Sequence, residues 1–179
     1  MGPYLPDIME QVVGRVNNTF STRLTDPFEV FFDKGIYSQV AKKVYSEEGA
    51  NTPLIWLIMN YSEDMGDFRY FSDVTCDMSI SATTEASYTQ QQRDDLIFKP
   101  RLLLIYDEFI KQIKAGGDFL IMGDVRHTRI IRPYWGGGLV GGPDTKNLFD
   151  QLYVDEIYIK GLRLKVKRQS ICVEQLITS

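Results

Sequence analysis

The chain has 179 residues, of which 44% are hydrophobic and 25% charged, and it carries a formal net charge of −4 with a sequence pI near 5.1. These values are typical of one packed globular domain and argue against a largely disordered chain. They also argue against a protein dedicated to nucleic-acid binding, because binding to phosphate backbones needs an excess of cations.

The cysteines and the apolar runs indicate the cellular compartment in which the protein is made. Cys76 and Cys172 form no Cys-x-x-Cys pair, so neither a disulfide framework nor a zinc site is expected. The N-terminus lacks the basic and apolar segments of a signal peptide. The longest apolar run, Leu54 to Met59, is far shorter than the ~20 residues that span a bilayer. We therefore expect free thiols, no membrane contact and synthesis in the cytosol.

The N-terminal part predicts a helix followed by an arm. Apolar residues recur at helical spacing behind Pro6, which suits a first helical turn, and they indicate a helix from about Pro6 to Asn17. The following polar segment leads to an apolar cluster at 28–32, which the turn signal Asp33-Lys34-Gly35 closes. We expect a short strand or an extended arm near 18–33.

The middle of the chain contains the clearest strand patterns. A short helix is expected over 36–45, where apolar residues line one face. Residues 54–59 form an unbroken apolar run that predicts a central strand buried on both faces. Apolar and polar residues alternate over 73–82, which indicates a strand with one apolar and one polar face.

A long helix and an irregular segment follow. Pro100 opens a run with helical spacing up to Ile113, and we expect the longest helix there. Residues 118–150 are the least regular part. Five glycines within 136–143 indicate a mobile loop, in an excursion near 132–146.

The last pattern is a strand with a change of face. Ile157 and Ile159 are apolar at odd positions, whereas Leu162, Leu164 and Val166 are apolar at even ones. A β-bulge at Gly161 explains the switch. The whole chain therefore predicts a single α+β domain over 1–179, with a largely antiparallel sheet and about three helices packed on one face.

No catalytic, metal or cofactor site is expected, and the chain does not look like an enzyme. The glycine loop ends in Gly142-Pro143-Asp144, which fits neither a P-loop nor a dinucleotide fingerprint. His127 is the only histidine, and no Gly-x-Ser-x-Gly elbow accompanies it. Glu63, Asp64 and Asp67 lack the spacing of a calcium loop and indicate a solvated turn.

The C-terminal strand carries a basic face. Its members are Lys160, Arg163, Lys165, Lys167 and Arg168. Such a face could bind DNA, contact an acidic neighbouring subunit, or discourage pairing between sheet edges. A subunit contact and edge protection are favoured over DNA.

The order of these segments resembles the tail-completion or tail-terminator type of phage neck protein. The resemblance is carried by Val30-Phe31-Phe32-Asp33-Lys34-Gly35 before a short helix, by Pro53-Leu54-Ile55-Trp56-Leu57, and by the run from Phe98 to Tyr106. It covers most of the chain. It implies a tail-terminator-like fold and a virion protein, assembled in the host bacterial cytoplasm, that forms a ring at the head-to-tail junction or tail end.

The resemblance also implies partners. The ring would be homo-oligomeric, would link the portal or adaptor to tail proteins, and would make at most passive contact with DNA in its lumen. The candidate subunit-interface residues are Phe31, Phe32, Tyr134, Trp135, Leu139 and Val140. The alternatives are a nucleic-acid-binding accessory protein that uses the basic strand, or a small enzyme with no recognisable motif.

Overall fold

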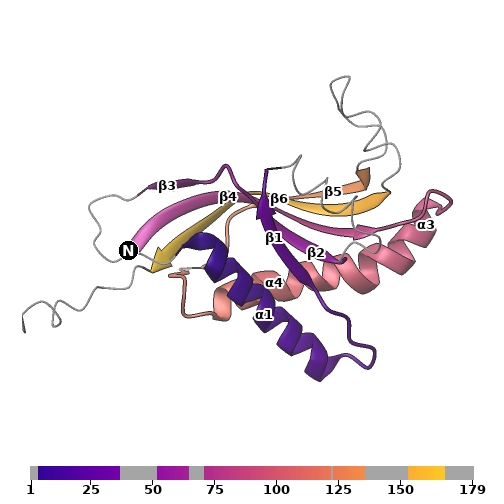
Figure 1. The fold of residues 1–179 in the computed structure, drawn as a ribbon, viewed down its shortest axis with the longest axis horizontal. Helices are drawn as coiled ribbons and strands as arrows, with labels where there is room; N and C mark the ends of the chain where they lie inside the picture. Colours follow the sequence, from indigo (N-terminus) through magenta and orange to yellow (C-terminus); the bar gives the residue numbers. More distant parts are fainter. Residues whose placement is uncertain (1–3, 37–51, 65–70, 122, 136–152, 168–179) are drawn as a thin grey trace, which may run out of the picture.

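The computed structural model describes residues 4–36, 52–64, 71–121, 123–135 and 153–167. It is α+β, as the sequence predicts, and its helices lie on one face of a twisted sheet (Figure 1). The sheet is mixed but mostly antiparallel, with the strand order β1-β2-β4-β6-β5 and with β3 paired to β4. The strands are β1 (Phe31–Gly35), β2 (Leu54–Ile58), β3 (Ser62–Asp64), β4 (Phe71–Thr83), β5 (Thr128–Trp135) and β6 (Val154–Lys167).

The helical layer has two parts in the described residues, not the three that were expected. The first is α1 (Leu5–Arg23). The second is a continuous helical run of α3 (Gln90–Arg93), the π-helical segment η1 (Asp94–Leu102) and α4 (Leu103–Ala115). The helix expected over 36–45 lies outside the described residues, apart from Ile36, which is in no helix or strand.

Helix α1 extends six residues beyond the predicted end at Asn17, through Arg23. Phe20 continues its buried stripe, with 3% of its surface exposed. The hydroxyl groups of Thr19 and Thr22 donate to the carbonyls four residues earlier in the helix, at 3.1 Å in both cases. The polar composition that indicated an arm is therefore accommodated by hydrogen bonds within the helix.

The second helical run begins ten residues before the predicted start at Pro100. Its N-terminus is a capping box, in which the Thr89 side chain accepts from the Gln92 amide and the Gln92 side chain accepts from the Thr89 amide. Pro100 lies inside η1. A proline has no amide proton and its ring collides with the carbonyl four residues earlier, so the wider π-helical turn accommodates it without ending the helix.

The segment 18–33 is not one extended arm. Asn17, inside α1, holds the segment that follows the helix through two hydrogen bonds to the backbone of Val30, each 2.8 Å long. The chain then enters β1, which pairs in parallel with β2. The expected turn at 33–35 was also wrong, because Gly35 pairs with Ile58 at the end of this parallel ladder.

Strand β2 is the buried strand that its unbroken apolar run predicted. All five residues are buried, and β2 lies between β1 and β4. Ile55 and Leu57 belong to the main core under the helices, whereas Trp56 points to the opposite face. Trp56 is nevertheless only 2% exposed, so this part of the sheet is buried on both faces.

Strands β4 and β6 form the longest pairing in the sheet. The register shifts between Cys76 and Met78, opposite Gly161, whose φ of +63° suits glycine. The predicted bulge and change of face are thereby confirmed. Before the shift Ile157 and Ile159 face the core, and after it Leu162, Leu164 and Val166 do so.

The irregular segment after α4 contains a strand that the sequence did not indicate. β5 pairs with the first half of β6, while Asp118, Leu120 and Arg126 continue along the same edge through backbone hydrogen bonds to the second half. Residues 132–135 of the expected loop excursion therefore belong to β5. The glycine-rich residues 136–143 lie outside the described part of the chain.

Candidate functional site

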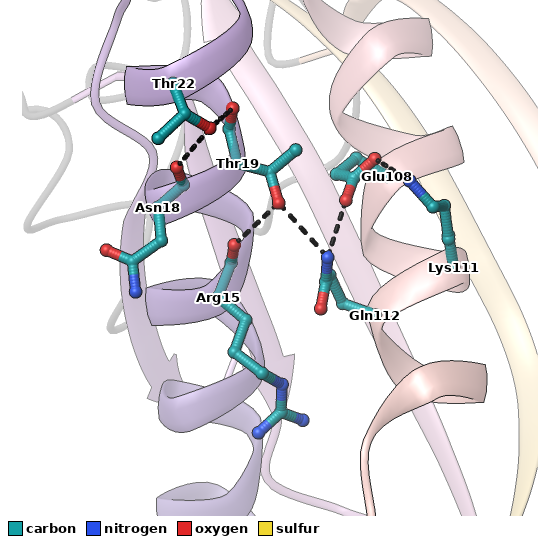
Figure 2. Close-up of polar contacts among 7 residues, drawn as sticks. All are labelled: Arg15, Asn18, Thr19, Thr22, Glu108, Lys111 and Gln112. Atoms are coloured by element: carbon teal, nitrogen blue, oxygen red, sulfur yellow. Dashed lines mark hydrogen bonds and ion pairs between the residues drawn. The ribbon is translucent and has the colours of Figure 1, made fainter.

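A polar clamp joins the two helices that cover the sheet (Figure 2). Gln112 on α4 donates to the Thr19 hydroxyl on α1 at 3.2 Å and to the Glu108 carboxylate at 2.6 Å. Lys111 donates to the other Glu108 oxygen at 3.1 Å. Glu108 is 8% exposed, so its charge is held by neighbours instead of by water. The clamp fixes how α1 and α4 sit together.

This clamp should make stability depend on pH. Burial raises the pKa of the Glu108 carboxyl, but hydrogen bonds from Gln112 and Lys111 outweigh burial, and the net pKa is lowered from 4.5. The carboxylate therefore stabilises the fold above the pKa of the unfolded chain, and this contribution is lost as the pH falls through the folded pKa.

We expect the Glu108→Gln variant to be less stable than the wild type near neutral pH, because the new amide side chain carries no charge for Lys111 to pair with. The difference in free energy of unfolding should shrink as the pH falls from about 7 to about 3. Urea denaturation at a series of pH values measures it. A difference that stays constant with pH would contradict the role of the Glu108 charge.

A buried ion pair connects the second helical run to the sheet. Arg93 Nη1 lies 3.8 Å from Asp155 Oδ1, and their side chains are 2% and 0% exposed. Arg93 also donates to the Tyr88 carbonyl at 2.7 Å. Both charges are withdrawn from water, so each is stabilised by the other and by nearby polar groups instead of by solvent.

A second polar network lies on the sheet face that α1 and α4 do not cover. Ser79 on β4 donates to one oxygen of the buried Glu156 on β6, and Arg132 on β5 donates to the other at 3.2 Å. The Arg132 guanidinium also lies 4.1 Å from the centre of the Tyr158 ring. The Glu156 carboxylate and the Arg132 cation thus connect three neighbouring strands through non-covalent contacts.

The same face carries a carboxylate at the bulge. Asp77 accepts from the Tyr158 hydroxyl at 2.6 Å and from the Gly161 amide at 2.7 Å. Burial, and then the hydrogen bond to Asp77, raise the pKa of Tyr158, so this tyrosine is neutral at physiological pH. Asp77 therefore satisfies the backbone amide that the bulge leaves without a ladder partner.

His127 lies at the start of β5 in a defined hydrogen-bonding environment. Its Nδ1 is 2.9 Å from the Val125 carbonyl, and its Nε2 is 2.6 Å from the Tyr106 hydroxyl. The carbonyl can only accept, so Nδ1 donates to it, while Nε2 forms its hydrogen bond with the Tyr106 hydroxyl. No serine or carboxylate takes part in these contacts, so the geometry is that of a packing contact.

A groove lies on the same side of the molecule as the β3–β4 hairpin. It has a volume of about 850 Å³. Strands β3, β4 and β6 and two short stretches, residues 120–121 and 124–126, contribute its lining. The charged lining residues are Glu63, Asp64, Asp73, Asp124, Arg126, Arg163 and Lys165. It therefore combines carboxylates and cations instead of presenting one sign of charge.

The structure places the predicted basic face beside carboxylates. Arg163 and Lys165 pair with Thr75 and Asp73 of β4, and Lys165 Nζ lies 3.6 Å from Asp73 Oδ1. Lys160 and Lys167 are exposed on the same strand, while Arg168 lies outside the described residues. The cations of β6 thus face a neighbouring strand that offsets part of their charge.

The candidate interface residues are split between the two ends of the sheet. Phe31 and Phe32 lie half-buried on β1. The backbones of Tyr134 and Trp135 belong to β5. Leu139 and Val140 lie outside the described residues, so the structure does not test whether they join this surface.

Within the described ranges, no group of three or more His, Cys, Asp or Glu side chains could hold a metal ion. Cys76 is buried and in no disulfide, and burial raises the pKa of its thiol to about 12. No helix among the described residues is long and apolar enough to cross a bilayer.

Sequence reasoning overlooked Arg126 as a groove residue and Glu156 as a buried charge. The alternation of β6 places Glu156 on the face opposite the core residue Ile157. Its burial therefore depends on Ser79 and Arg132 of the neighbouring strands and left no local signal. Arg126 carried no such signal either. No protein-family model matches the chain, and no curated protein matches its sequence.

Proposed function

We propose that this chain is a structural subunit of a homo-oligomeric ring at a tailed-phage head-to-tail junction or tail end, where it links portal or adaptor proteins to tail components. The observation that carries the proposal is the pair of end strands in the described sheet, that is, its two edge strands β1 and β5. β1 and β5 lie at opposite ends of the strand order, and each carries an apolar side chain that its own fold leaves partly uncovered.

The two uncovered side chains are Ile131 and Phe31. Ile131 on β5 is 50% exposed although its partner across the ladder, Ile157, is fully buried. Phe31 on β1 is half-buried opposite Leu54. An end strand with apolar side chains favours pairing with another chain. Two different patches on one subunit are what a heterologous contact needs, and such contacts close into rings when the rotation permits.

The polar clusters support a structural role over a catalytic one. Glu108, Asp155, Glu156 and Asp77 are each held by partners within the fold. A catalytic site needs polar groups that converge on space for a substrate. These four carboxylates instead connect helix to helix, helix to sheet, or strand to strand. They give the rigid body that a ring subunit needs to keep its closure angle.

The test is to replace Ile131 by lysine and measure assembly. We expect the wild type to form closed rings in negatively stained images and to show a multiple of the monomer mass of 20.6 kDa in light scattering. Ile131→Lys should shift this mass toward the monomer, because a charge on an end strand opposes pairing between chains.

The matched control is Leu96→Lys. Leu96 is 49% exposed, about as much as Ile131, but it lies on η1 and not on an end strand. Its substitution should leave the rings intact. A wild-type chain that stays monomeric, alone and with virion extract, or equal losses in both variants, would contradict the proposed role of the sheet ends.

A further inference from the structure

The groove beside β3 contains two arginines that form no salt bridge with any other residue in the described part of the chain. Arg126 and Arg163 both line it and are exposed. Their backbones lie side by side, because the Arg163 amide donates to the Arg126 carbonyl at 3.1 Å. The two arginines therefore line one groove from neighbouring segments.

Two carboxylates in the groove have lysine partners. Asp73 pairs with Lys165 at 3.6 Å, and Asp124 pairs with Lys114 at 2.8 Å. Neither Arg126 nor Arg163 forms a salt bridge among the described residues. Glu63 and Asp64 line the groove from β3, where both are exposed.

Two cations of this kind favour a bound anion. Neighbouring like charges repel, and an anionic group between them replaces that repulsion with attraction. Guanidinium groups also bind carboxylate and phosphate oxygens through paired hydrogen bonds, which a lysine cannot reproduce. The groove has an apolar part as well, because Leu120, 36% exposed, and Ile121 contribute to its lining.

We propose that this groove binds a small organic anion, whose single carboxylate or phosphate group contacts Arg126 and Arg163 and whose apolar part packs against Leu120. The exposed carboxylates of Glu63 and Asp64 on β3 lie beside this site and repel the further phosphates of a polyanion, so duplex DNA does not occupy it. This site is separate from the sheet ends and does not depend on ring assembly.

The experiment is an NMR titration of the ¹⁵N-labelled full chain with acetate, hexanoate and inorganic phosphate at constant ionic strength. We expect saturable shifts of the amides at 120–126 and 163–165. Hexanoate should bind at least threefold more tightly than acetate, because its longer chain buries more apolar surface. Comparison of acetate with phosphate identifies which anionic group the arginines prefer.

The double variant Arg126→Ala with Arg163→Ala should weaken binding at least tenfold. Arg101→Ala, which removes an exposed arginine of η1, should leave binding unchanged. Superimposable spectra away from the groove verify that the variants fold. Shifts that do not saturate with any of the three anions, or an equal effect of Arg101→Ala, would overturn the proposal. Saturable binding of a DNA duplex at the same amides would also overturn it.

Discussion

Replacing Asp155 by alanine is expected to lower the free energy of unfolding by about 3–5 kcal/mol, the largest effect we expect from removing a single charge. The substitution leaves the Arg93 guanidinium inside the protein, with 2% of its side chain exposed, after the carboxylate 3.8 Å away is gone. An uncompensated buried cation costs far more than the pair contributes while it is intact.

Urea denaturation at pH 7 measures this loss. The informative companion is the double variant Arg93→Met with Asp155→Leu, which removes both charges and keeps most of the volume. It should recover to within about 1–2 kcal/mol of the wild type, because apolar replacements of buried pairs are often neutral. If the double variant were as unstable as Asp155→Ala, the loss would come from packing and not from the stranded charge.

Replacing Trp56 by alanine is expected to cost about 3–5 kcal/mol as well, for a different reason. Trp56 is 2% exposed on the sheet face that the helices leave uncovered, between Asp33 of β1 and Ser79 of β4. Its removal would open a cavity beside two short polar side chains that cannot fill it.

Trp56→Phe is the matched control, because it keeps an aromatic ring and should lose less than half as much. The measurement is again the midpoint and slope of urea denaturation. A loss below about 1 kcal/mol for Trp56→Ala would mean that Trp56 is open to solvent in the unassembled chain, since the cost of truncation follows burial.

Patterns of period two predicted much of the sheet. The alternation at 73–82 depends only on which side of a strand each residue faces, and this is set locally. The run at 54–59 is a different local signal, because an unbroken apolar run indicates a strand buried on both faces. The bulge at Gly161 was also predictable, because a change of face without a turn requires an extra residue. These features became β2, β4 and β6 as expected.

Features that depend on distant partners were not predictable in the same way. The parallel pairing of β1 with β2 depends on a connection of about 18 residues and leaves no local signal. Arg15 and Asp118 form a 2.9 Å ion pair across 103 positions. The start of the second helical run is different, because the Thr89-x-x-Gln92 capping box is a local signal that the sequence itself contains.

The candidate site likewise combines features that local patterns predicted with features that depend on distant partners. The described members of the basic face lie on β6 as predicted, namely Lys160, Arg163, Lys165 and Lys167. The carboxylates that face them on β4 depend on the register between the strands. Asp73 becomes the partner of Lys165 only once that register is set. Arg126 joins Arg163 only because residues after α4 return along the edge of β6.

The single extra residue at Gly161 decides which side chains in the second half of β6 face the core. Their orientation therefore depends on the number of residues between the two halves of the strand. Deleting one residue there would turn Leu162, Leu164 and Val166 outward and would drive Arg163 and Lys165 into the core. Asp77, which holds the Gly161 amide, would lose its backbone partner in the same event. Changes of length are therefore far less tolerable at this position than substitutions of the exposed lysines that flank it.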